Sequence, residues 1–120
     1  MLPVSLSETD TFTETVPLLV DSGAEDVLLD FEVAELMNID LRGAKEERIY
    51  GFGNMEELGY AKQISILVEG FKHPIIADVI FVKNLGITGI LGQRDLFEHY
   101  RITFDKPHRS FSLEDMPYLL

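Results

Sequence analysis

The feature that most constrains the fold is a long strand-like stretch interrupted by glycines, ERIYGFGNMEELGYAKQISILVEG at residues 47–70. Its two arms meet around Gly51 and Gly53, where glycine supplies the backbone freedom that a tight turn requires. The segment MEEL just after the turn is acidic and polar, as is typical of an exposed arm. The stretch therefore predicts a long β-hairpin.

Strand patterns outnumber helical patterns in the rest of the chain. Short helices are predicted at DFEVAELMN, with Asp30 as the N-cap, and at QRDLFEHY, which follows the small apolar stretch GITGILG. Strands are predicted at PVSL (3–6), FTETVPLLV (12–20) and HPIIADVIFV (73–82), with a hairpin about the DKPH turn in RITFDKPHRSFSL (101–113). The patterns predict one mainly β domain over residues 1–120, with one or two short helices.

Composition narrows the classes of function. The formal net charge of −11 argues against nucleic-acid binding, because neutralising phosphates requires clustered Lys and Arg. No apolar run is long enough to cross a membrane, and the start MLPVSLSETD lacks the pattern of a signal peptide. The absence of cysteine excludes disulfides and suits a reducing compartment, so we expect a cytoplasmic protein without a membrane partner.

Several common functional sites can be set aside. His73, His99 and His108 lack the spacing of metal ligands, and no Walker-type loop or calcium-binding aspartate ladder is present. GFGNME has Glu56 where a dinucleotide-binding loop has its third glycine. Ser22 lacks the Gly-x-Ser-x-Gly setting of a nucleophile. We therefore expect no metal and no cofactor.

The remaining candidate is Asp21 in the stretch VPLLVDSGAED, residues 16–26. Taken alone, the triplet Asp21-Ser22-Gly23 is most simply a turn that ends a strand. The apolar PLLV before it, however, predicts a largely buried carboxylate, which is costly unless it is paired or hydrogen-bonded. A hydroxyl residue and a glycine beside such an acid indicate a carboxylate that approaches another group closely.

The segment LLVDSGAEDVLL resembles the active-site segment of the retroviral-type (retropepsin-like) aspartic proteases, which is apolar-apolar-Asp-Thr/Ser-Gly-Ala. Other segments match in the same order: the hairpin at Gly51–Gly53 falls where the family has its flap, and GILG (89–92) before QRDLFEHY resembles the second signature. The ending YRITFDKPHRSFSLE is similar to that of microbial members. The resemblance extends from about Pro3 to Leu113 and implies a closed acid-protease barrel with one lobe per chain.

The resemblance implies an aspartic-type endopeptidase, a hydrolase that cleaves polypeptide substrates. Aspartic proteolysis uses two carboxylates that share one proton, because two like charges this close together cannot both ionise. No other aspartate in this sequence is followed by Ser/Thr-Gly, so one chain supplies half of a site. A symmetric homodimer would bring the Asp21 of each protomer together across a two-fold axis.

The resemblance also assigns roles around Asp21. Ser22 and Gly23 would support the active-site loop, the serine hydroxyl tying the two loops together and the glycine leaving room for close approach. Substrate would contact the flap tip and the subsites, here Leu19, Ala24, Glu25, Leu28, Gly51, Phe52, Gly53, Thr88 and Ile90. For each of Leu19, Leu28 and Ile90, the alternative that the side chain only packs in the hydrophobic core remains equally open.

Two departures from the family pattern concern Glu25, where many retroviral members have Asp, and Gln93, where they have Arg. An ion pair between Glu25 and Arg94 is an alternative way to tie these segments together. A catalytically silent relative that binds peptides or only dimerises is the competing hypothesis. A third, an acidic β domain that serves as a scaffold, leaves the glycine-tipped hairpin unexplained.

Overall fold

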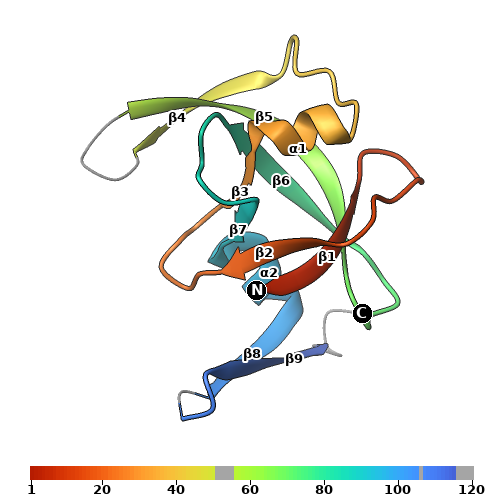
Figure 1. Ribbon diagram of the computed structural model, residues 1–120, viewed down its shortest axis with the longest axis vertical. Helices are drawn as coiled ribbons and strands as arrows, with labels where there is room; N and C mark the ends of the chain where they lie inside the picture. Colours follow the sequence, from red (N-terminus) through yellow and green to blue (C-terminus); the bar gives the residue numbers. More distant parts are fainter. Residues whose placement is uncertain (51–55, 106, 116–120) are drawn as a thin grey trace.

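The computed structural model describes residues 1–50, 56–105 and 107–115, which form nine strands and two short helices (Figure 1). The strands are β1 (Leu2–Ser7), β2 (Val16–Val20), β3 (Val27–Asp30), β4 (Lys45–Tyr50), β5 (Glu56–Val68), β6 (Ile75–Val82), β7 (Gly89–Leu91), β8 (Tyr100–Asp105) and β9 (Ser110–Asp115). The helices are α1 (Phe31–Leu36) and α2 (Gln93–His99). The prediction of a mainly β chain with two short helices is confirmed.

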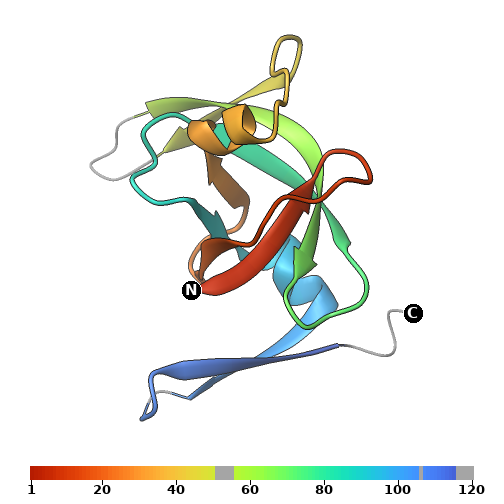
Figure 2. The ribbon, with the colours of Figure 1, turned by 45° about the vertical axis from the view of Figure 1, so that its right-hand side comes forward.

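The first seven strands form one sheet that closes on itself. Its order is β1-β2-β7-β3-β6-β5-β4, and an additional antiparallel pairing of β1 with β5 closes a six-stranded barrel, with β4 attached outside the ring. The closure is visible in Figure 2, where β5 bends from its pairing with β4 toward β1. Closing the sheet leaves few free strand edges and gives a single interior for the apolar side chains.

The barrel interior is filled by aliphatic side chains and one large aromatic ring. Alternation along the strands directs every second residue inward, and the second half of β6 is buried throughout. The largest fully buried side chains are Phe81, Leu6, Leu18, Leu29, Ile64, Ile66, Leu91, Val4, Val27, Val68 and Val79. They come from six different strands, so burial of apolar surface holds the whole ring together.

The long hairpin predicted from the glycine-interrupted stretch is confirmed in its two arms. β4 and β5 pair antiparallel in a continuous register from Lys45↔Ala61 to Tyr50↔Glu56. Residues 56–58 of the second arm are exposed, as their polarity predicted. The expected tip residues Gly51, Phe52 and Gly53 lie outside the described residues.

Both predicted helices are confirmed. Asp30 caps α1, its Oδ2 accepting from the Glu32 amide at 3.0 Å, as its position before the helix predicted. Its Oδ1 accepts from the Leu85 amide at 2.9 Å, and its own amide donates to the Thr88 carbonyl at 2.9 Å. One aspartate therefore joins β3, the start of α1 and the 83–88 loop.

Three local assignments differ from the sequence patterns. β3 and β7 were not recognised as strands, because each is short and is defined by partners distant in sequence. Residues 12–15, predicted as the start of a strand, instead form a loop. Thr13 fixes that loop, since its amide donates to the Leu6 carbonyl at 2.9 Å and its hydroxyl accepts from the Leu6 amide at 3.1 Å.

The C-terminal hairpin was predicted and is confirmed as a separate two-stranded sheet, β8–β9, which projects below the barrel in Figures 1 and 2. In the described part of the chain, no helix is both long and apolar enough to span a lipid bilayer.

Candidate active site

The loop that carries Asp21 joins two strands that flank the same short strand. β2 pairs with β7 in parallel, with Leu19 opposite Ile90, and β3 pairs with β7 antiparallel, with Leu28 opposite Ile90. The Asp21 amide continues the first of these ladders by donating to the Leu91 carbonyl at 3.0 Å. The 21–26 loop therefore wraps around the end of β7 at the barrel surface.

The Asp21 side chain is oriented by its own loop. Its Oδ1 accepts from the Gly23 amide at 2.8 Å, and the Asp21 carbonyl accepts from the Ala24 amide at 3.2 Å. A Cβ on Gly23 would lie only 3.2 Å from Asp21 Oδ1, which is tighter than an ordinary contact. Residue 23 therefore lies directly against the carboxylate, and glycine leaves that space clear.

The expectation of a largely buried carboxylate is wrong for the single chain. Asp21 is half-buried, Ser22 and Gly23 are exposed, and Leu19 in the preceding strand is 40% exposed. Only Leu18 within β2 is fully buried, because it faces the barrel interior. The opposite face of the strand is left uncovered at the position of the acid.

Gly92 lies directly beneath the loop. A Cβ at residue 92 would come within 2.4 Å of the Asp26 carbonyl oxygen, 2.8 Å of the Ala24 carbonyl oxygen and 2.8 Å of the Asp26 nitrogen. All three atoms are backbone, so they cannot move aside as a flexible side chain can. Gly92, the second glycine of GILG, is therefore required because its segment packs closely against the backbone of residues 24–26.

The first residues of α2 complete this attachment. The Gln93 amide donates to the Ala24 carbonyl at 2.9 Å, and the Arg94 amide donates to the Glu25 carbonyl at 2.9 Å. The Gln93 side-chain amide also donates to the Ser22 carbonyl. The loop is thus held along most of its length by β7 and the start of α2.

Arg94 adds charge to the same contact. Its Nη1 lies 3.1 Å from Asp26 Oδ1, and its Nη2 lies 3.9 Å from Glu25 Oε2. The pair with Glu25 that the sequence suggested is therefore present but long, whereas the shorter pair is with Asp26. Sequence reasoning missed Asp26, although its position beside Glu25 was a usable signal.

The apolar candidates for substrate contact fall on one face of the sheet. Leu19 and Leu28 lie on either side of Ile90 in register, and paired residues in neighbouring strands share a face. Leu28 and Ile90 are half-buried, whereas Leu18, Leu29 and Leu91 on the opposite face are fully buried. The structure thus brings these three candidates together on the accessible side, next to the loop of Asp21.

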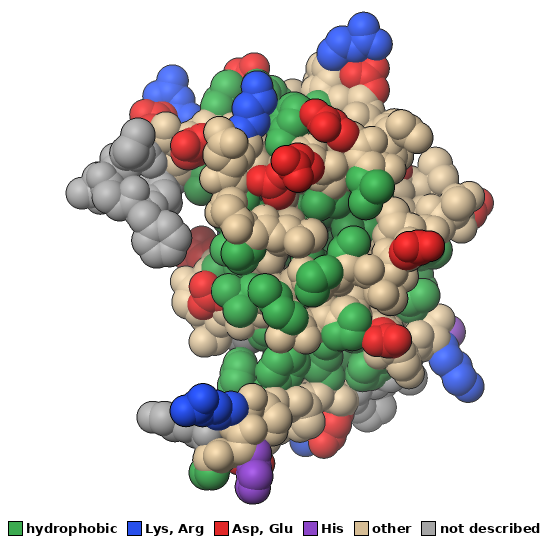
Figure 3. Space-filling model, in the orientation of Figure 1, with side chains coloured by type: hydrophobic (Ala, Val, Ile, Leu, Met, Phe, Trp, Pro, Cys, Tyr) green, Lys and Arg blue, Asp and Glu red, His purple; other side chains and the backbone are tan. Residues whose placement is uncertain are grey.

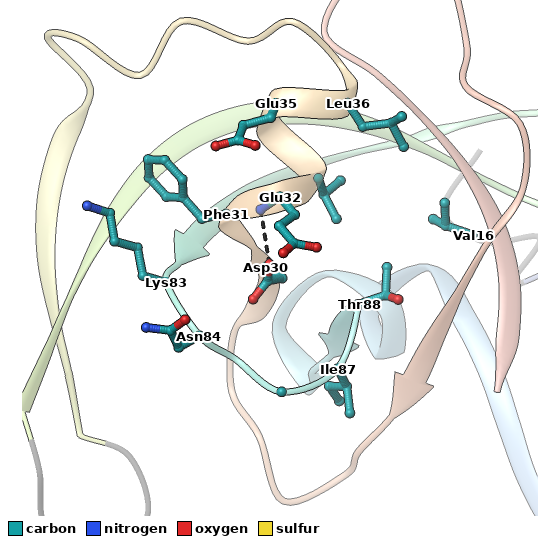
Figure 4. A pocket seen from close by; sticks show the side chains of 12 residues that line it. Val16, Asp30, Phe31, Glu32, Glu35, Leu36, Lys83, Asn84, Ile87 and Thr88 are labelled. Atoms are coloured by element: carbon teal, nitrogen blue, oxygen red, sulfur yellow. Dashed lines mark hydrogen bonds between the residues drawn. The ribbon is translucent and has the colours of Figure 1, made fainter.

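Thr88 belongs to a hollow that does not include Asp21. It lines an open hollow of about 1080 Å³ between α1 and the 83–88 loop, which Figure 4 shows from close by. Glu32, Glu35 and Lys83 also line this hollow, and Asp21 does not. The hollow therefore reaches Thr88, two residues before Ile90, without including the candidate acid.

Asp95 on α2 is a half-buried acid that the sequence did not single out. Burial raises the pKa of its carboxyl, and the charges of Glu98 and Asp78 raise it further. Its Oδ2 is buried and has no hydrogen-bond partner among the described residues. These residues also contain no group of three or more His, Cys, Asp or Glu side chains arranged to hold a metal ion.

The chain was compared with known proteins. No family model matches the sequence, and no curated protein matches it. Among solved structures, the retroviral protease-like domain of Ddi1 from Leishmania major matches with a TM-score of 0.58 at 19% identity, covering 97% of this chain and 90% of that chain. A retropepsin-like aspartic protease from Rickettsia conorii matches with a TM-score of 0.61 at 24% identity, covering 87% and 83%. The fold of this chain is that of the retropepsin-like aspartic proteases.

Proposed function

We propose that the chain is an aspartic endopeptidase that works as a homodimer and hydrolyses peptide bonds. The observation that carries the proposal is the Asp21 loop. Its carboxylate is oriented by the Gly23 amide at 2.8 Å, half-buried, and placed at the surface of a retropepsin-like barrel. The sequence has one Asp-Ser-Gly triplet, so a second chain must supply the second carboxylate.

The proposed chemistry follows from two Asp21 carboxylates that share one proton. The ionised member takes a proton from a water molecule as that water attacks the scissile carbonyl carbon. The protonated member donates a hydrogen bond to the carbonyl oxygen and stabilises the charge that develops on it. The carboxyl that took the proton from water then donates it to the departing nitrogen as the C–N bond breaks, which releases the carboxylic acid and the amine and leaves the pair with one shared proton again.

Neighbouring residues have supporting roles in this proposal. Gly23 keeps the approach to Asp21 open, and the Ser22 hydroxyl contacts the partner's loop. Substrate side chains pack on Leu19, Leu28 and Ile90, with Ala24, Glu25 and Thr88 around them. The tip residues Gly51, Phe52 and Gly53 act as a flap that closes over the substrate.

A second candidate function is a catalytically silent module that binds peptides or only dimerises. The arrangement around Asp21 favours the enzyme. A peptide-binding groove gains nothing from a carboxylate against which residue 23 leaves little room for a Cβ, and the loop is fixed by contacts from β7 and α2. Dimerisation is common to both functions, so peptide cleavage separates them.

The proposal is tested by incubating the chain with an unfolded protein from about pH 3 to about pH 7. Asp21→Asn is the control, because the amide keeps the shape but cannot share the proton. We expect the wild type to cleave the protein with a maximal rate below neutral pH and to be inhibited by pepstatin. We expect no cleavage by Asp21→Asn. Equal cleavage by both proteins, or none by either, would contradict the proposed enzyme.

A further inference from the structure

The long strand β5 contains a glycine at a point where it is paired on both sides. Gly59 is buried and lies opposite Glu47 of β4 and Val82 of β6, so it belongs to neither a turn nor a strand end. Its φ lies outside the left-handed region that favours glycine. Glycine weakens the interior of a strand, so its presence here indicates that other groups approach the backbone closely.

Two isoleucines fill the space that a side chain at residue 59 would need. A Cβ there would lie 2.4 Å from Cγ2 of Ile80 and 2.9 Å from Cδ1 of Ile49. The next neighbour, the Phe81 carbonyl oxygen, would be at an ordinary contact distance of 3.4 Å. Ile80 belongs to β6 and Ile49 to β4, the strands on either side of β5. The glycine therefore lets side chains from both neighbouring strands converge over it.

Ile80 belongs to the face of the sheet that carries Leu19, Leu28 and Ile90, here called the substrate face. It lies opposite Leu28 in the parallel pairing of β3 with β6, and paired residues in neighbouring strands share a face. Leu28 is half-buried, whereas Ile80 is only 5% exposed. The substrate face therefore continues from β7 and β3 to β6, where Ile49 of the long hairpin adjoins it.

The β4–β5 hairpin extends from this contact on the side of the molecule that holds the 21–26 loop, as both ribbon views show (Figures 1 and 2). In the orientation of Figure 1, hydrophobic side chains gather over β2 and β7, below the hairpin (Figure 3). The two arms are paired without a break from Lys45↔Ala61 to Tyr50↔Glu56. A displacement at residue 59 would therefore be passed along the hairpin toward its outer end.

We propose that Gly59 is a positioning residue for substrate binding. Because residue 59 has no Cβ, Ile49 lies close to Ile80, and this contact sets the distance between the hairpin and the substrate face. The proposal rests on the protease proposed above, in which the hairpin covers a bound polypeptide. A side chain at residue 59 would push β4 away from Ile80 and weaken the contacts that the hairpin makes with the substrate.

Gly59→Ala tests this role in a peptide-cleavage assay. We expect KM to rise at least about fivefold and kcat to change less than about twofold, because the displaced hairpin loses contacts that bind substrate and transition state alike. Val68→Ala is the control, since Val68 is fully buried in the same strand, where β5 pairs with β1. It should lower the thermal stability and leave KM unchanged.

Shortening the two isoleucines should remove the effect of the added methyl group. Ile80→Leu removes Cγ2 and Ile49→Val removes Cδ1, the two atoms closest to a Cβ on residue 59. In a chain with both changes, Gly59→Ala should alter KM less than about twofold, and an undiminished effect would overturn the proposal. If Gly59→Ala alone does not fold, recovery of folding in this doubly changed chain supports the proposal, and failure to recover overturns it.

Amide hydrogen exchange measures the position of the hairpin without relying on catalysis. Each variant also carries Asp21→Asn, so that proteolysis plays no part. Gly59→Ala should accelerate exchange of the β4 amides at least about tenfold, and the changes at Ile49 and Ile80 should reverse this acceleration. An equal acceleration in β4 by Val68→Ala would show only a general loss of stability and would overturn the positioning role.

The outcomes separate this proposal from the enzyme assignment. If the wild type cleaves peptides and Gly59→Ala leaves KM unchanged, the role of Gly59 is rejected and the enzyme stands. If the wild type cleaves nothing, the enzyme is rejected. In that case, faster β4 exchange in Gly59→Ala that is reversed by the changes at Ile49 and Ile80 still supports Gly59 as the residue that positions the hairpin, and unchanged exchange rejects it.

Discussion

At the scale of single residues, Arg94 is the side chain that links α2 to two acids of the 21–26 loop. It contacts Asp26 at 3.1 Å and Glu25 at 3.9 Å, and its side chain is still 58% exposed. Exposed ion pairs contribute little to stability, because water and salt screen them. The value of this pair therefore lies in fixing the position of the loop.

Arg94→Gln should consequently affect activity more than stability. We expect the free energy of unfolding to fall by less than about 1 kcal/mol, because the pair is screened. Peptide turnover should fall at least about tenfold, because the loop loses a contact that positions Asp21. Denaturant unfolding and a cleavage assay measure the two effects.

Arg42→Gln is the matched control for that prediction. Arg42 pairs with Asp40 at 2.9 Å, far from the loop in sequence, and holds the pKa of that carboxyl at about 2. Breaking this pair should leave turnover unchanged. An equal loss of turnover in both variants would show that Arg94 has no positioning role.

The raised pKa of Asp95 predicts that the stability of the fold depends on pH. Burial raises the pKa of its carboxyl above the ordinary value of 3.8, so the folded chain holds this proton more tightly than the unfolded chain. The acid therefore destabilises the fold increasingly as pH rises from 3.8 through the raised pKa. The groups that set this pKa are Glu98, Asp78, His99 and Arg94.

Replacing the acid should remove the effect. Asp95→Asn should melt at a higher temperature than the wild type at neutral pH, and the difference should shrink as pH falls toward about 4. Asp10→Asn changes the net charge equally at an exposed position and is the control. A difference in melting temperature that stays constant with pH, or that the control reproduces, would refute this assignment to Asp95.

At the scale of elements, the site depends on how closely β7 and α2 approach the loop. Gly92→Ala would place a Cβ 2.4 Å from the Asp26 carbonyl oxygen. We expect a loss of about 1–3 kcal/mol in stability, as is usual for overpacking, together with loss of cleavage because the 24–26 backbone must shift. Unfolding curves and cleavage rates measure both.

Gly70→Ala is the control for this close contact. Residue 70 has open space around it and a φ of +90°, so alanine there costs stability through backbone strain alone. The Gly70→Ala variant should cleave peptides at the wild-type rate at temperatures where it is folded. Full cleavage activity in Gly92→Ala would show that the loop tolerates displacement.

The same elements show what the sequence could and could not predict. The cap at Asp30, both helices and the β8–β9 hairpin were predictable, because each depends on side chains that are near one another in the chain. β7 was not, since three residues become a strand only through pairing with β2 and β3. The exposure of Leu19 and the pair between Asp26 and Arg94 likewise depend on tertiary arrangement.

At the scale of the whole molecule, charge opposes assembly. Each chain carries a net charge of −11, so two chains repel each other at long range. Salt screens the repulsion, and a lower pH reduces the negative charge. The dimer dissociation constant should therefore fall as salt rises from about 0.05 M to about 0.5 M, as measured by sedimentation. Weaker association at high salt would contradict this balance.

In the proposed enzyme, each active site is made of one Asp21 from each of two chains. Mixing wild type with Asp21→Asn at constant total concentration, well above the dimer dissociation constant, tests this directly. Because dimers with one or two variant chains lack the shared proton, an equal mixture should keep about a quarter of the wild-type activity. Retention of about half, in proportion to the wild-type fraction, would show that each chain acts alone and would contradict the two-chain site.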